Sequence, residues 1–202
     1  MHSFANHCER STNILLRLLK DEENTVFKQM ETSAATINIL LLRDFNHTRA
    51  FYTIGMFSSF EAVLQSYSYK SFQAVKDTLE ANNSMKLLKR FNIYKDAINV
   101  LKHGKGSSYD RLKKKVNLPF TIKYCDEPFY EGDVSEIDTL IDVDNEFIVN
   151  CVDLIRDVCI ELGITTEATK HNSQQWITWF LCKVKRILNS IFKKLHKWIH
   201  VL

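Results

Sequence analysis

The chain has 202 residues, of which 45% are apolar and 25% are charged, and its formal net charge at pH 7 is +3. This length and apolar content suffice for the core of one domain, which excludes a globally disordered chain. Five glycines and two prolines leave few helix breakers, so we predict an all-α fold. The expected architecture is a compact multi-helix bundle at 1–168, followed at 169–202 by a linker and a basic amphipathic C-terminal helix.

The N-terminus lacks a basic start followed by an apolar run, so we expect no secretory signal and a cytoplasmic protein. The five cysteines are unclustered, which favours reduced core thiols over disulfides. No uncharged apolar stretch reaches the roughly 18 residues of a bilayer span, and Glu61 interrupts the nearest one. Neither C-x-x-C nor H-E-x-x-H occurs, so we expect no metal and no cofactor.

Apolar spacings of three and four residues predict three helices in the first third of the chain. We expect them at 11–20, 26–45 and 49–68. The polar residues at 21–24 and 46–48 are expected to separate them. The third of these helices is rich in aromatic residues and is predicted to be the most buried.

A fourth helix is predicted to end at Gly104. Its outer, polar face is expected to carry Lys95, Asp96, Asn99, Lys102 and His103. Ser107 and Asp110 have the spacing of a capping box and predict a short basic helix after it. Residues 117–133 are expected to be irregular or briefly extended.

The last helix of the bundle has clear ends, with Asp144 as its N-cap and Gly163 as its stop. Residues 165–175 are polar and read as a linker. Charge is unevenly distributed around this region: residues 126–146 contain nine acids and no lysine or arginine, whereas seven basic residues and no acid follow Glu167. The asymmetry suggests that one part of the chain, or of a second copy, binds another.

His103 and Asn99 lie one helical turn apart, so both can act on one bound group. A histidine can take a proton from a ribose 2'-hydroxyl, as metal-independent RNA cleavage requires. Residues 102–115 add six basic residues and one acid, and Arg111 can fold back toward His103 to stabilise charge on a phosphate. The alternative is that His103 merely complements the C-terminus of its helix.

Residues 104–108 are small apart from one lysine. They do not form a P-loop, because a helix precedes them and the upstream glycine is missing. An anion-binding nest and a plain turn between two helices both remain open.

The segment around His103 resembles the motif of the HEPN superfamily, in which an Arg, often followed by Asn, precedes a His by several residues. Asn99, His103 and Gly104 match the pattern. The register of the family Arg holds Ile98, and the neighbouring registers hold Ala97 and Asp96. The resemblance implies a helical bundle that forms a homodimer and engages RNA, as a metal-independent endoribonuclease of a bacterial defence or toxin type.

In that function His103 would be the acid/base and Asn99 would orient it or the phosphate. The RNA backbone would be held by basic residues, which are Lys102, Lys105, Arg111, Lys113 and Lys114. A different class of function also fits, namely a non-catalytic dimeric interaction module built on the same fold.

Residues 176–202 form an amphipathic pattern with lysines and an arginine on one face and no acid. The pattern is typical of a final bundle or dimerisation helix, of a helix that docks on a protein partner, or of a membrane-surface anchor. If this helix is a membrane-surface anchor, the protein is a peripheral membrane effector.

Overall fold

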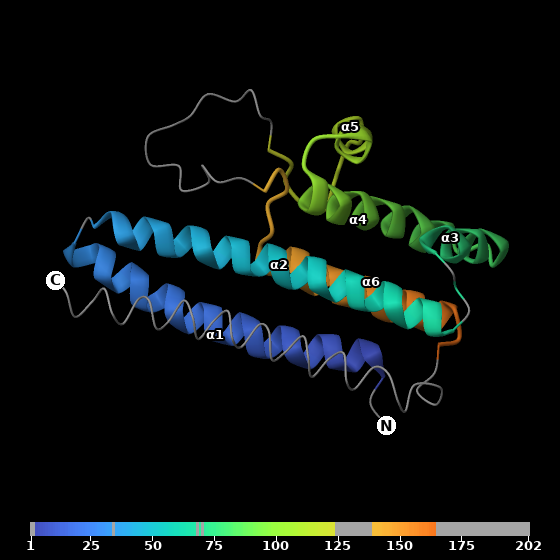
Figure 1. Cartoon of the computed structure of the whole chain (residues 1–202), viewed down its shortest axis with the longest axis horizontal. Helices are drawn as coiled ribbons and strands as arrows, with labels where there is room; N and C mark the ends of the chain where they lie inside the picture. The colour runs from blue at the N-terminus through green and yellow to red at the C-terminus, as the bar shows by residue number, and fades with distance from the viewer. Residues whose placement is uncertain (1–2, 34, 68, 70, 124–138, 165–202) are drawn as a thin grey trace. The chain divides into compact units, whose positions relative to one another are not determined.

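The computed structural model describes residues 3–33, 35–67, 69, 71–123 and 139–164. This part of the chain is all-α, as predicted. Its only β-type pairing is one antiparallel bridge between Ile122 and Ile141. The helices are α1 (Phe4–Thr32), α2 (Thr36–Ser66), α3 (Phe72–Ala81), α4 (Met85–His103), α5 (Ser107–Lys113) and α6 (Asn145–Glu161) (Figure 1).

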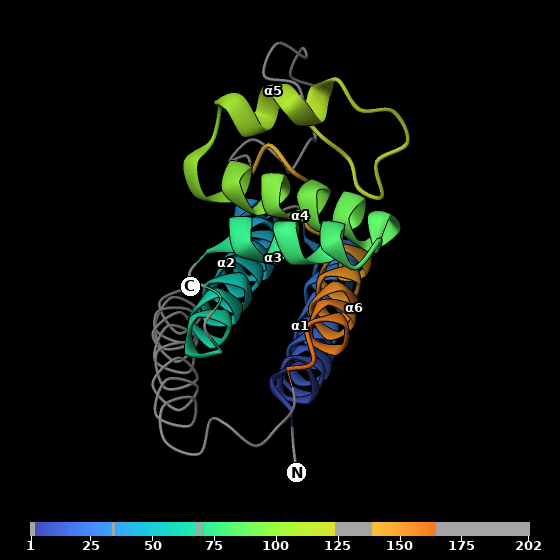
Figure 2. The ribbon, with the colours of Figure 1, turned by 90° about the vertical axis from the view of Figure 1, so that its right-hand side faces the viewer.

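The long helices α1, α2 and α6 pack against one another, and α4 lies across α2 and α6. Helices α3 and α5 contact α4, so α4 joins the short helices to the bundle (Figure 2). The largest fully buried side chains include Phe57 and Phe60 of α2, Phe91 and Tyr94 of α4, and Phe147 of α6. Burial of such aromatic side chains dominates the stability of a small core.

Two predicted helix breaks are wrong, because residues 21–24 lie inside α1 and residues 46–48 lie inside α2. One side chain from each of these two segments binds Arg49. The guanidinium of Arg49 donates to Glu23 Oε1 at 2.5 Å and to Asn46 Oδ1 at 3.2 Å. Arg49 is buried, and a buried cation must be paired in this way.

The actual break separates Thr32 from Thr36, and it splits the apolar stripe predicted for 26–45 between two helices. Several members of that stripe are exposed, among them Phe27 and Ile37. The helix predicted to be most buried does supply Phe57 and Phe60 to the core, but its Phe51 is 69% exposed.

The predicted ends of the later helices are largely confirmed. Gly104 caps α4 with a φ of 72°, a conformation that favours glycine. Asp144 caps α6 and accepts a hydrogen bond from the Phe147 amide at 2.7 Å. The predicted capping box at Ser107 is wrong, because Ser107 is already helical and Gly106 takes the N-cap position without a side-chain bond.

Several predictions fall outside the described residues. They are the domain boundary at 168/169, the linker at 165–175, the amphipathic helix at 176–202, Cys125 and Cys182, and most of the acidic stretch. Within the described ranges, no helix combines the length and the apolar character needed to cross a bilayer.

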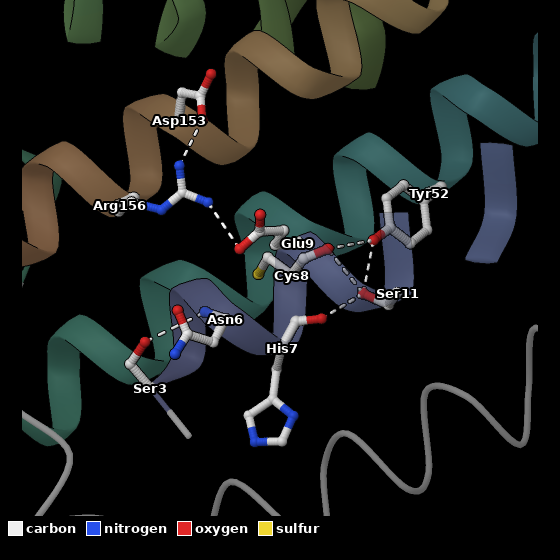
Figure 3. A network of polar contacts seen from close by, with 9 residues as sticks. All are labelled: Ser3, Asn6, His7, Cys8, Glu9, Ser11, Tyr52, Asp153 and Arg156. Atoms are coloured by element: carbon white, nitrogen blue, oxygen red, sulfur yellow. Dashed lines mark hydrogen bonds and ion pairs between the residues drawn. The ribbon is translucent and has the colours of Figure 1, made fainter. Parts of the chain in front are cut away.

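A polar network fastens the first turns of α1 to α2 and α6 (Figure 3). Arg156 of α6 pairs with Glu9 at 2.9 Å and with Asp153 at 2.7 Å. The Tyr52 hydroxyl of α2 shares a hydrogen bond of 2.8 Å with Ser11 Oγ and donates to the Cys8 carbonyl at 3.3 Å. The network therefore fixes how α1 lies on its two neighbours.

Three cysteines of the described chain, Cys8, Cys151 and Cys159, are buried and carry free thiols. Burial raises the pKa of all three thiols, that of Cys159 to about 12. A thiol is nucleophilic only as the thiolate, so these cysteines act as core side chains.

Replacing Tyr52 with Phe is expected to lower the free energy of unfolding at pH 7 by about 1 kcal/mol, because buried hydrogen bonds are lost. Burial raises the pKa of Tyr52 to about 12, above the value near 10 of an unfolded chain. The parent therefore loses this stabilisation as pH rises from about 10 towards 12. Urea unfolding at pH 7 and pH 11 should show the deficit of Tyr52→Phe shrinking at the higher pH, and an unchanged deficit would contradict this account.

Candidate nucleic-acid interface

The candidate site lies at the C-terminal end of α4. Asn99 is half-buried and His103 is exposed in the last turn. The amide of Gly104 donates to the Val100 carbonyl at 2.8 Å and closes the helix. His103 is therefore open to solvent, and the two lysines that flank it in the sequence, Lys102 and Lys105, are exposed as well.

Asp96 was predicted on the exposed polar face of α4, but the structure buries it to 4% exposure. Asp96 is buried because α5 packs against α4 and Arg111 of α5 binds this carboxylate. A buried carboxylate is tolerated when charged hydrogen-bond donors surround it.

Arg111 of α5 is the residue that pairs with Asp96. Its Nε donates to Asp96 Oδ2 at 3.0 Å and its Nη2 donates to Asp96 Oδ1 at 2.6 Å. These hydrogen bonds raise the pKa of Arg111. A bidentate pair of this kind fixes the plane of the guanidinium, while the Arg111 side chain remains 50% exposed.

Ser108 connects this ion pair to Asn99. Its hydroxyl accepts from Arg111 Nη2 at 2.9 Å and lies 3.4 Å from Asp96 Oδ1. Asn99 Nδ2 lies 3.5 Å from the same hydroxyl. The guanidinium therefore sits one side chain away from Asn99.

His103 lies apart from this network. Arg111 folds back onto α4 as expected, but it engages Asp96, seven residues before His103. At the helical rise this separation is about 10 Å. Among the described residues, no hydrogen bond or ion pair joins His103 to Arg111.

Buried side chains fill the three registers in which the HEPN pattern would place its Arg. Ile98, Ala97 and Asp96 are all buried, so no side chain in these registers faces solvent. The guanidinium of Arg111, which Ser108 connects to Asn99, comes from α5 instead, and the buried carboxylate of Asp96 holds it.

The remaining predicted phosphate-binding residues differ in their surroundings. Lys114 is exposed. Lys113 lies 3.3 Å from Asp110 Oδ1 and its ammonium lies 4.6 Å from the centre of the Tyr109 ring. We call the set Lys102, Lys105, Arg111, Lys113 and Lys114 the α4–α5 basic surface.

The site prediction did not include Lys95, which is half-buried one turn before Asn99. Burial lowers its pKa, Asp96 opposes that shift, and Lys76 of α3 and Arg111 add to it. Lys95 is expected on the polar face of α4, but nothing in the local sequence indicates that its side chain is half-buried.

No group of three or more His, Cys, Asp or Glu side chains that could hold a metal ion occurs within the described ranges. Comparison with protein-family models, with curated proteins and with solved structures found no match.

Proposed function

We propose that this protein is a HEPN-like RNA-binding protein that cleaves RNA without a metal ion, as the resemblance implies for enzymes of bacterial defence and toxin systems. The observation that carries the proposal is the α4–α5 basic surface. It presents a fixed, half-exposed guanidinium that Ser108 connects to Asn99, and an exposed histidine flanked in the sequence by two exposed lysines.

The chemistry follows from the imidazole. His103 takes the proton of a ribose 2'-hydroxyl, and the resulting oxygen attacks the adjacent phosphorus. The bond to the 5'-oxygen breaks, and this oxygen leaves with a proton from an acid group or from water. The products are a 2',3'-cyclic phosphate and a 5'-hydroxyl. Lys102 and Lys105 stabilise the charge that develops on the phosphate oxygens.

Binding itself is tested by titrating fluorescently labelled single-stranded RNA with the full chain and following anisotropy at 50 and 200 mM salt. Because lysines and arginines displace counterions from the phosphates, affinity should fall as salt rises. Saturable binding with a clear salt slope supports the proposal. No binding at 50 mM salt would contradict it.

A second candidate is a non-catalytic, dimeric interaction module. Exposed apolar side chains on α1 and α2 favour it, since Ile14 and Leu18 share one helix face and Ile37 and Leu40 share another. The pairing of Arg111 with Asp96 also reduces the positive charge available for a phosphate. This module would assemble with a second copy or a protein partner and would leave RNA intact.

A further inference from the structure

One face of α2 lies outside the packed core of the described chain. Helix α2 packs on α1, α4 and α6 through its opposite face. The outward face carries residues at alternating spacings of three and four, which we call the α2 seam: Ile37, Leu40, Asp44, His47, Phe51 and Ile54. No member of the seam is buried, and Phe51 is 69% exposed. Spacing of this kind is typical of a helix that packs along a second helix.

The seam has apolar ends and a charged middle. Ile37 and Leu40 are 40% and 42% exposed at one end, and Phe51 supplies the apolar surface at the other. Asp44 and His47 lie between them. A lipid surface does not match this order, because the Asp44 carboxylate would enter the apolar layer. A second helix with the same order of side chains matches it.

A second copy of the chain matches the seam when two α2 helices run antiparallel about a two-fold axis. If the axis passes midway between Asp44 and His47, each carboxylate meets an imidazole of the other copy. A parallel pair would instead place Asp44 against Asp44, which is unfavourable. The other layers of the antiparallel pair join apolar side chains, Leu40 with Phe51 and Ile37 with Ile54.

We infer that the α2 seam is the contact between two antiparallel copies of this chain. Charge complementarity between Asp44 and His47 selects both the second copy and its orientation. His47 packs against Phe51 of its own chain, with ring centroids 6.3 Å apart. An imidazole has two ring nitrogens, so it can also donate to a carboxylate of the second copy. The inference concerns assembly and is independent of RNA binding.

The length of the seam sets the expected strength of the dimer. From Ile37 to Ile54 it spans about 26 Å of helix. This is less than the three to four heptads over which coiled coils are recognised. We therefore expect a reversible dimer with a dissociation constant in the micromolar range.

The first test is sedimentation velocity of the full chain without RNA over a range of micromolar concentrations. It compares Phe51→Gln with Ile160→Gln, since Ile160 of α6 is 72% exposed and lies outside the seam. Both side chains are exposed, so both variants should keep the thermal midpoint of the parent. Phe51→Gln should raise the dissociation constant at least tenfold, because each dimer loses two contacts with Leu40. Ile160→Gln should dimerise as the parent does.

The second test exchanges the charged residues of the seam. Asp44→His places two imidazoles in contact and His47→Asp places two carboxylates in contact, so each should weaken the dimer several-fold. The double variant, with Asp44→His and His47→Asp combined, restores the opposite pairs and should dimerise nearly as the parent does.

Three outcomes would overturn the inference. A parent that stays monomeric at every concentration would mean that the seam is covered within one chain or by a different protein. A dimer that Phe51→Gln leaves intact would use another face. Single variants that weaken the dimer, without recovery in the double variant, would exclude the antiparallel arrangement.

Discussion

His103→Ala is expected to abolish RNA cleavage measured in EDTA. Removing a positioned acid/base group typically costs about 10² to 10⁴ in rate, which places the variant near the background of an RNA cleavage assay. RNA binding should be little changed, because the α4–α5 basic surface remains. The measurement is the rate of product formation from end-labelled RNA, together with anisotropy for binding.

The matched control is His7→Ala, which removes an exposed histidine of α1 and should cleave at the parent's rate. DNA of the same sequence should resist cleavage by the parent, because it lacks the 2'-hydroxyl. Cleavage that persists in His103→Ala would remove this residue from the mechanism. Binding without any cleavage by the parent would favour the interaction module.

Arg111→Met is expected to lower the free energy of unfolding by about 3 kcal/mol, because it leaves the buried Asp96 carboxylate without its charged partner. RNA affinity should fall as well, since the half-exposed guanidinium is lost. Asp96→Asn in the same background should recover part of the stability, because no buried charge then remains. Urea unfolding of the parent, both single variants and the double variant measures the coupling.

Arg90→Met is the control for the loss of the ion pair between Arg111 and Asp96. Arg90 binds Asp157 at 2.7 Å, but that carboxylate is 47% exposed and stays hydrated after the change. The loss of stability should therefore be smaller than for Arg111→Met. Equal losses of unfolding free energy for Arg111→Met and Arg90→Met would contradict this explanation. So would a double variant that recovers no stability, because burial of Asp96 would then not determine the loss.

The parts of the fold that were predicted correctly have local causes. Asp144 caps α6 through a bond to an amide three residues later, and Gly104 and Gly163 adopt positive φ values at helix ends. Such effects depend on neighbouring residues only, so periodicity and capping rules detect them. The all-α class follows in the same way from the scarcity of glycine and proline.

The failures have non-local causes. Glu23 and Asn46 lie in the two predicted helix breaks, but their side chains bind Arg49, which also donates to Asn145 of α6 at 2.9 Å. The break after Thr32 contains neither glycine nor proline, so the residue types there do not predict the end of a helix.

The same distinction between local and non-local causes applies to the candidate site. The position of His103 at an exposed helix end followed from the sequence around Gly104. Burial of Asp96 did not, because it depends on Arg111, 15 positions later, folding back across α4.

Photo-crosslinking of single-stranded RNA to the full chain, with the crosslinked peptides identified by mass spectrometry, tests the account most directly. We predict crosslinks at α4 and α5, between residues 95 and 115, that excess unlabelled RNA removes. Crosslinks confined to other parts of the chain would contradict the assignment of RNA binding to this surface.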